Sequence, residues 1–335
     1  MKLEGQKVLV TGADGFIGSH LTELLVRTGC SVTALSQYDS FGHNGWLDDL
    51  SEDVRASIEI DRGDIRDPSF VQRIVDGKQT VFPLAALIAI PYSYAAPHSY
   101  VSVNVNGTLN ILEACRSIGI HRLVHTSTSE VYGTAQFTPI SEDHPLVAQS
   151  PYAASKIGAD MMVTAYARSF DLPAVILRPF NTYGPRQSER AVLPTIIRQA
   201  IDPECEAIHV GNLTPIRDFN YVEDIAEAFA AAGITDRLEF GIPYNAGSGI
   251  GVTIEETASL ICKICGTNKP IENDENRHRP ENSEVFELLA NAENFQKTTG
   301  WMSNVNLRDG LTKTIEWWRQ QYERTNLRRD RGMMY

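Results

Sequence analysis

The feature that most constrains the fold is a glycine-rich turn between an apolar stretch and an amphipathic one. Residues 7–10 (KVLV) form a short apolar run, and the following segment, TGADGFIGSHLTELLVRTG, carries apolar residues at helical spacing. Between them stand Gly12, Gly15 and Gly18, where glycine permits a sharp turn and lets a pyrophosphate approach the amides of a helix N-terminus. A second apolar strand follows at residues 31–35 (SVTAL). This order predicts an α/β fold with a Rossmann-type, doubly wound parallel sheet that binds a dinucleotide beside Phe16 and Ile17.

Length, charge and cysteine usage narrow the class of protein. A chain of 335 residues exceeds the size of one typical core, so a second, smaller lobe is expected. The net charge of −12 argues against nucleic acid or an anionic membrane as a partner. The five scattered cysteines and the absence of a long apolar run predict a cytoplasmic protein. Cys262 and Cys265 form a CxxC on an amphipathic pattern without a second ligand pair, so core packing is favoured over a metal or redox site, and no metal is predicted.

Residues 125–156 concentrate the groups that redox chemistry on a sugar needs. Tyr152 and Lys156 are four residues apart, which places them on one face of a helix, and a lysine there can lower the pKa of a tyrosine so that it acts as a base. An ordinary helix start is the alternative. Thr128, Ser129 and Glu130 follow an apolar strand at residues 122–126, and parallel strands place ligands beyond their carboxyl ends. Together with the glycine turn, these residues predict an active site.

From the G-x-x-G-x-x-G spacing onward the chain resembles the extended short-chain dehydrogenase/reductases. Their second strand often ends in an acidic residue that binds the adenosine ribose, but Ser36 and Gln37 occupy that place here. A 2′-phosphate would be expected to need an Arg or Lys near this turn, and none lies between Arg27 and Arg55, so NAD is preferred over NADP.

The resemblance assigns further residues to the cofactor. Asp64 and Ile65, after a third strand, are placed at the adenine, with a surface helix cap as the alternative for Asp64. The small-residue turn of Leu84, Ala85 and Ala86 and the strand end at Thr126 are placed along the dinucleotide. Asn104 is expected to support the active site, or else to be a helix-surface amide.

The chain is expected to divide into two interleaved domains. The segment LRPFN at residues 177–181 resembles the point where extended dehydrogenases leave the cofactor domain, and RDFNYVEDIAEAFAAA resembles a return to it through a turn and a helix. The predicted domains are residues 1–180 plus 219–250, which bind NAD, and residues 181–218 plus 251–335, which bind a nucleotide sugar. The resemblance places five residues at the substrate: Asn181, Arg186, Leu193, Arg217 and Arg279. Arg217 and Arg279, in RDFxYVxD and RPxxSEV, match residues that clamp a diphosphate, and solvated surface charges are the alternative.

The resemblance extends over essentially the whole chain and is strongest to nucleotide-sugar 4,6-dehydratases that act on N-acetylglucosamine nucleotides in legionaminic or pseudaminic acid pathways. It implies that Tyr152 takes the proton from the sugar O4, that Lys156 binds the nicotinamide ribose, and that Thr128 holds O4. Glu130 would then abstract the C5 proton made acidic by the C4 ketone. Ser129 replaces the Asp that protonates the leaving hydroxyl in many glucose-nucleotide dehydratases, although GDP-mannose 4,6-dehydratases also read Thr-Ser-Glu. Helices starting near Ser102 and Tyr152 pair in many relatives, which implies a homodimer.

Three alternatives remain open from the sequence. The enzyme could release a 5,6-ene or invert C5. It could be a nucleotide-sugar 4-epimerase or decarboxylase. It could also be a non-catalytic NAD-sensing regulator of the same fold, although the presence of all four catalytic residue types argues against that.

Overall fold

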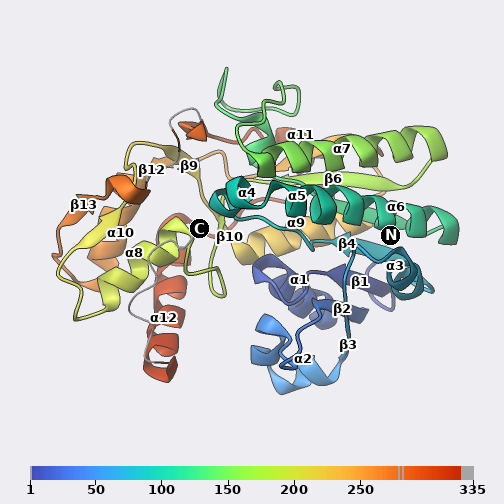
Figure 1. Cartoon of the computed structure of the whole chain (residues 1–335), viewed down its shortest axis with the longest axis horizontal. Helices are drawn as coiled ribbons and strands as arrows, with labels where there is room; N and C mark the ends of the chain where they lie inside the picture. Colours follow the sequence, from blue (N-terminus) through green and yellow to red (C-terminus); the bar gives the residue numbers. More distant parts are fainter. Residues whose placement is uncertain (1, 278–279, 281–282, 326–335) are drawn as a thin grey trace.

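A sheet of seven parallel strands forms the centre of the molecule (Figure 1). The computed structural model describes residues 2–277, 280 and 283–325. In spatial order the strands are β3 (Ile58–Gly63), β2 (Ser31–Gln37), β1 (Lys7–Thr11), β4 (Thr80–Pro83), β5 (Arg122–Thr126), β6 (Ala174–Pro179) and β11 (Pro243–Ala246). The order runs outward in both directions from β1 and β4, which confirms the predicted doubly wound, Rossmann-type fold.

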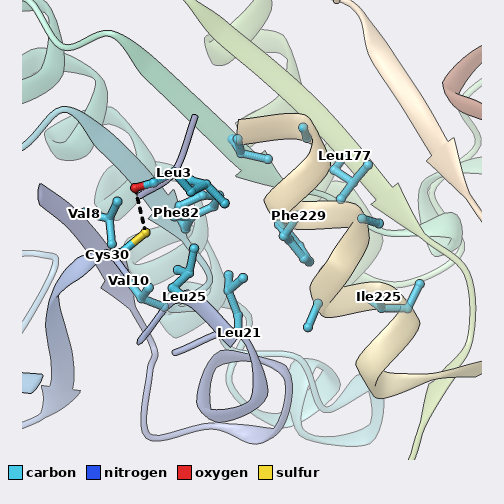
Figure 2. Packing of buried hydrophobic residues seen from close by; sticks show 14 of the residues in the cluster. Leu3, Val8, Val10, Leu21, Leu25, Cys30, Phe82, Leu177, Ile225 and Phe229 are labelled. Atoms are coloured by element: carbon cyan, nitrogen blue, oxygen red, sulfur yellow. Dashed lines mark hydrogen bonds between the residues drawn. The ribbon is translucent and has the colours of Figure 1, made fainter. Parts of the chain in front are cut away.

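Helices α1 (Phe16–Arg27) and α9 (Val222–Ile234) cover one face of this sheet. Figure 2 shows their buried side chains meeting those of the strands; the labelled residues are Val8, Val10, Leu21, Leu25, Phe82, Leu177, Ile225 and Phe229. In the same cluster the Cys30 thiol donates a hydrogen bond to the Leu3 carbonyl at 3.3 Å. The short helices η1 (Gly45–Asp49) and α2 (Glu52–Ala56) follow β2. This packing fixes α1, and with it the glycine turn, against the sheet.

The opposite face is covered by α3 (Pro68–Val75), α6 (Gly107–Ile118) and α7 (Pro151–Phe170). Asp67 caps α3 through the amides of Ser69 and Phe70, and the Ser150 hydroxyl caps α7 through the amide of Ala153. The chain reaches α6 through α4 (Ile90–Ala95), α5 (Pro97–Tyr100) and the π-helix η2 (Val101–Asn106), and both α4 and α5 carry a proline in their first turn, where proline is compatible with a helix.

A second group of elements lies beside the large sheet, on the left of Figure 1. Its strands are β7 (Thr182–Tyr183), β8 (Ile208–Val210), β9 (Ile216–Asp218), β10 (Asn220–Tyr221), β12 (Gly251–Thr253), β13 (Ile271–Asn273) and β14 (Glu287–Leu288). Its helices are α8 (Val192–Ile201), α10 (Ile254–Cys265), η4 (Glu275–Arg277) and α12 (Leu307–Thr325). A separate apolar cluster joins α8, α10 and α12, and both cysteines of the CxxC pack in it or against it. The predicted turn at Arg217 and Asp218 is wrong, since these residues belong to β9.

The two groups of elements are interleaved along the chain. Phe295 of α11 (Glu293–Thr299) and Trp301 pack in the core under the large sheet, with the Phe295 ring 6.1 Å from that of Tyr244 on β11. Residues late in the chain therefore return to the first core, and the domain limits predicted from the sequence stay a prediction. Within the described residues, no helix has the length and apolar character needed to cross a bilayer, and no group of three or more His, Cys, Asp or Glu has metal-binding geometry.

Candidate functional site

A cavity of about 670 Å³ opens at the carboxyl ends of the central strands. Most of the residues predicted for the site line it. These are Gly12, Gly15, Phe16, Ile17, Gly18, Gln37, Asp64, Ile65, Leu84, Ala85, Ala86, Thr126, Thr128, Ser129, Glu130, Tyr152, Lys156, Asn181 and Arg186. Parallel strands end on one edge of a sheet, so segments far apart in sequence meet there.

The glycine turn is packed too tightly for any side chain. Gly12 has a φ of +65°, and a Cβ on it would lie 2.7 Å from the amide nitrogen of Ala85. A Cβ on Gly18 would lie 2.1 Å from the carbonyl oxygen of Gly12. The Thr11 hydroxyl accepts a hydrogen bond from the same Ala85 amide at 3.1 Å. The turn and the Leu84–Ala86 segment thus form one close-packed floor at the N-terminus of α1.

The end of β2 differs from the prediction. Ser36 is buried and lies outside the cavity lining, while its neighbours Leu35 and Gln37 line the cavity, because successive residues of a strand point to opposite faces. Asp14, which the sequence analysis passed over, also lines the cavity, and its carboxylate accepts a hydrogen bond from the Gln37 amide at 3.3 Å. Burial raises the pKa of Asp14, although bonds from Gln37 and Ser36 oppose this. An acidic group therefore lies at the end of β2, although it comes from the glycine turn.

Two arginines, Arg62 and Arg66, lie nearer to the end of β2 than their positions in the sequence indicate. Arg62 pairs in register with Ser36 and donates hydrogen bonds to Asn44 and to the Gly42 carbonyl. Arg66 lines the cavity and forms an ion pair with Asp64 at 2.5 Å. The hydrogen bond from Arg66 lowers the pKa of Asp64. The helix-cap alternative for Asp64 is wrong, because Asp67 caps α3.

Asn104 connects the cavity floor to α7. Its amide oxygen accepts from the Leu87 amide at 2.9 Å, and its amide nitrogen donates to the Leu87 carbonyl and the Ser155 hydroxyl, each at 2.9 Å. The residue is buried, so the surface-amide alternative is wrong.

Tyr152 and Lys156 lie on the first turns of α7 and both are buried. Burial raises the pKa of Tyr152, a hydrogen bond with Thr128 opposes this, and the Glu130 charge adds to the rise. Burial lowers the pKa of Lys156 to about 8, and the Lys156 ammonium donates a hydrogen bond to the Thr126 carbonyl at 2.5 Å. The pKa of Tyr152 is therefore raised overall in the protein chain, because burial is the largest effect, and the expectation that Lys156 lowers it stays a prediction.

The segment after β5 brings a hydroxyl and a carboxylate to the same tyrosine. Thr128 caps the short helix η3 (Ser129–Tyr132), its hydroxyl accepting from the Glu130 amide at 3.2 Å. Ser129 is 3% exposed, so little of it reaches the cavity it borders. Thr128 forms a hydrogen bond that lowers the pKa of Tyr152, the charge of Glu130 raises it, and all three residues line the same cavity.

The residues predicted to bind substrate separate into two sets. Asn181 and Arg186 line the cavity, with Gln187 and Ser188 beside them. Trp46 also lines it and was not predicted, because no motif marks it. Leu193 is buried in the apolar cluster of α8, and Arg217 bonds to the Ile216 and Phe286 carbonyls; neither lines the cavity. Arg279 falls outside the described residues.

Several polar atoms in the lining have no hydrogen-bond partner within the part of the chain that is described. They are Thr126 Oγ1, Asn181 Oδ1 and Gln187 Oε1, all nearly inaccessible to water. Buried polar atoms are normally paired, so unpaired ones in a cavity wall indicate a polar ligand. With the close-packed glycine floor, they fit a dinucleotide beside a second polar molecule.

Comparison with known proteins gives consistent matches over nearly the whole chain. A sequence model of the family described as GDP-mannose 4,6 dehydratase matches residues 9–314. The chain is 32% identical over 326 residues to a trifunctional UDP-glucose 4,6-dehydratase/UDP-4-keto-6-deoxy-D-glucose 3,5-epimerase/UDP-4-keto-L-rhamnose-reductase of Arabidopsis thaliana, covering 95% of this chain and 48% of that protein. It therefore spans about half the length of that relative.

Two solved structures have the same fold. One is a UDP-N-acetylglucosamine 4-epimerase from Methanobrevibacter ruminantium M1 in complex with UDP-N-acetylmuramic acid, with a TM-score of 0.86, 28% identity and coverage of 95% of this chain and 99% of that one. The other is DesIV, a dTDP-glucose 4,6-dehydratase from Streptomyces venezuelae with NAD bound, with a TM-score of 0.81, 27% identity and coverage of 95% and 98%.

Proposed function

We propose that this chain, which belongs to the GDP-mannose 4,6-dehydratase family, is a NAD-dependent nucleotide-sugar 4,6-dehydratase acting on UDP- or GDP-N-acetylglucosamine. The product would be a 4-keto-6-deoxy sugar nucleotide for bacterial surface-sugar biosynthesis. The observation that carries the reaction type is the convergence of Thr128 and Glu130 on Tyr152 at one end of the cavity. A 4-epimerase needs the hydroxyl and the phenol, whereas elimination of water also needs a base for the C5 proton.

The residues of the chain fit NAD. The glycine floor with Ala85 would hold the pyrophosphate, Asp14 and Gln37 the adenosine ribose, and Asp64 with Ile65 the adenine. NAD, when bound, accepts hydride from C4 of the sugar and returns it to C6 later in the cycle. The relative DesIV binds NAD, which supports the choice of cofactor. Asp14 supports it as well, since a carboxylate at the end of β2 would repel a 2′-phosphate.

The side chains at the other end of the cavity would carry out the proton transfers of the reaction. Tyr152 takes the proton from O4 while Thr128 holds that oxygen, and Lys156, protonated at neutral pH, binds the nicotinamide ribose. Glu130 then removes the C5 proton. Because a serine hydroxyl is a poor acid and Ser129 is buried, the protonated Glu130 carboxyl is the acid we assign to the departing C6 hydroxyl.

The substrate class rests on two kinds of support. The Thr-Ser-Glu segment resembles that of dehydratases acting on N-acetylglucosamine nucleotides, and a structural relative is a UDP-N-acetylglucosamine 4-epimerase. Asn181, Arg186 and Gln187 line the part of the cavity that leads toward the second group of elements. We propose that this part receives the nucleotide sugar, and that the chain works in the cytoplasm as a homodimer.

A mass-spectrometric substrate panel tests the function. The purified protein is incubated with UDP-N-acetylglucosamine, GDP-N-acetylglucosamine, GDP-mannose, dTDP-glucose and UDP-glucuronic acid, without added NAD. We expect a product lighter by one water from an N-acetylglucosamine nucleotide, because the hydride is recycled on bound NAD. A product of unchanged mass would identify an epimerase, and loss of carbon dioxide from the matching uronic acid a decarboxylase. No conversion of any nucleotide sugar would favour the NAD-sensing regulator.

The role of Glu130 is tested by Glu130→Gln. This variant should oxidise C4 and accumulate NADH absorbance, but lose C5 proton exchange with deuterated water and form no dehydrated product. Glu142→Gln is the control, since Glu142 is a partly buried carboxylate outside the cavity lining that accepts from the Asn245 amide at 2.8 Å. Normal dehydration by Glu130→Gln would assign both proton transfers to another group.

A further inference from the structure

We propose that Asp160 is a positioning residue that fixes the reactive end of α7 to the ends of β5 and β6 and keeps Lys156 charged. Asp160 lies four residues after Lys156 on α7, which is about one helical turn. It does not line the cavity, and it is fully buried. This inference rests on the proposed function, because it concerns the lysine assigned there to the cofactor.

One carboxylate joins three elements of the fold. Ser127, at the end of β5, donates its hydroxyl hydrogen bond to Oδ2 of Asp160 at 2.7 Å. Arg178 of β6 donates two hydrogen bonds to the same oxygen, at 2.9 and 3.2 Å. Nε2 of His125, also on β5, lies 3.3 Å from Oδ1. His125 and Ser127 are alternate residues of an extended segment, so both face α7.

Between these two residues stands Thr126, whose carbonyl accepts the hydrogen bond of the Lys156 ammonium. The contacts of Asp160 with His125 and Ser127 therefore hold the segment on both sides of Thr126, whose carbonyl is the hydrogen-bond acceptor of Lys156. The next residues along the same segment are Thr128 and Glu130. We infer that Asp160 sets the distance from Tyr152 and Lys156 on α7 to Thr128 and Glu130 after β5.

The charges around Lys156 give the carboxylate a second effect. Burial lowers the pKa of Lys156, and Asp160 is the charge that opposes this. Burial also opposes ionisation of Asp160, but the interaction with the nearby His125 ring and the charge of Arg178 outweigh it and lower the Asp160 pKa. Burial lowers the pKa of His125, so this ring is neutral at neutral pH. The other titratable groups around the pair are Tyr152 on α7, Glu130 and Tyr132 on η3, and Tyr100 on α5.

Removal of the Asp160 charge would leave the buried Lys156 ammonium without the charge that opposes the loss of its proton. The Lys156 ammonium would then lose its proton at a lower pH. A residue that only stabilised the fold would have no such effect on the titration of Lys156.

The test compares Asp160→Asn with Asp224→Asn. Asp224 is also a buried carboxylate, and it accepts hydrogen bonds from Ser303, Asn304 and Val305 at 3.0 to 3.1 Å, none of which lines the cavity. The first measurement is NMR titration of isotope-labelled lysine Nζ, which does not depend on catalysis. Lys156 should titrate at about 8 in the unaltered protein, at a clearly lower pH in Asp160→Asn, and at its original pH in Asp224→Asn.

The second measurement is the pH profile of dehydration. In Asp160→Asn the basic limb should move to lower pH by about one unit, and kcat at pH 8 should fall about fivefold with KM for the nucleotide sugar nearly unchanged. Asp160→Glu keeps the charge but displaces the oxygens, so it should retain the basic limb and lower kcat. It also serves as the test if Asp160→Asn does not fold. An unchanged Lys156 titration in Asp160→Asn, an equal shift in Asp224→Asn, or unaltered kcat in Asp160→Glu would overturn the inference. Absence of dehydration in the unaltered protein would instead reject the proposed function and leave the titration result standing.

Discussion

Arg186 was predicted to bind substrate, but its contacts predict a role in retaining the cofactor. It lies in the segment of residues 184–191, which connects β7 to α8 and contributes to the cavity wall. Its guanidinium contacts α1 through an ion pair with Glu23 at 3.0 Å and a 3.5 Å hydrogen bond to the Ser19 hydroxyl. His20 on the same helix lies 3.0 Å from the Pro185 carbonyl. The segment is therefore held across the cavity by the helix that begins at the glycine turn.

The expected effect of Arg186→Ala on NAD release follows from how deeply the Arg186–Glu23 ion pair is buried. The side chains of Arg186 and Glu23 are 14% and 22% exposed, which lies between a solvated pair and a buried one. Exposed pairs contribute about 0.2 to 1 kcal/mol, and hydrogen bonds to charged groups about 1.5 to 3 kcal/mol. We expect about 1 kcal/mol here, so Arg186→Ala should release NAD about fivefold faster.

The assay follows the dissociation of NAD from preloaded protein in the presence of an excess of an NAD-consuming enzyme. Arg27→Ala is the control, because Arg27 pairs with the same Glu23 carboxylate at 2.8 Å but is 58% exposed and does not contact the 184–191 segment. Release should be unchanged in this control. If Arg186→Ala retained NAD as well as the unaltered protein and instead raised KM for the nucleotide sugar, the retention argument would be refuted and the substrate prediction would stand.

Three further predictions concern binding and stability. Gly18→Ala should abolish NAD binding in calorimetry, because the new Cβ would lie 2.1 Å from the Gly12 carbonyl oxygen. Lys269→Met should lower the free energy of unfolding in urea by about 2 kcal/mol, because the ammonium donates to three carbonyls at the C-terminus of α8. Burial lowers the pKa of His20 from 6.5 to about 4, so the unfolded chain binds this proton more readily and stability falls as the pH drops through that window. Urea unfolding at pH 7 and pH 4.5 should show that His20→Gln removes about 2 kcal/mol of this fall.

The sequence predicted the elements that a parallel sheet requires. Strand β5 has the bounds expected from RLVHT, because a buried parallel strand appears as a short apolar run between turns. Strand β9 was missed because it is short and its partners, β12 and β14, lie far along the chain. Such pairing depends on tertiary contacts that no local pattern records.

For the site, the sequence predicted which segments meet but not which side chains face the cavity. Ser36 and Gln37 were both assigned to the cofactor, yet the alternation of a strand allows only one of two neighbours to face it. Asp14 stands inside the glycine motif itself, so its position could have marked it. Arg62 and Arg66 were not considered as partners of the cofactor, because the search for basic residues near Ser36 followed the sequence. The β2–β3 register nevertheless brings Arg62 beside Ser36.

The four-residue spacing of Tyr152 and Lys156 does not determine the pKa of either side chain. A separation of four residues places Lys156 on the same helical face as Tyr152, but the direction of the ammonium depends on its acceptors, and the Thr126 carbonyl holds it. Burial alone makes the phenol a weaker acid and the ammonium a stronger one, which is the opposite of what a phenolate base needs. Two interactions oppose these effects of burial: a hydrogen bond with Thr128 lowers the pKa of Tyr152, and the charge of Asp160, on the same helix, raises the pKa of Lys156. The proposed roles of Tyr152 and Lys156 therefore depend on the contacts that join α7 to β5 and β6. Substitutions at these contacts should alter the pH dependence of the proposed reaction before they alter substrate binding.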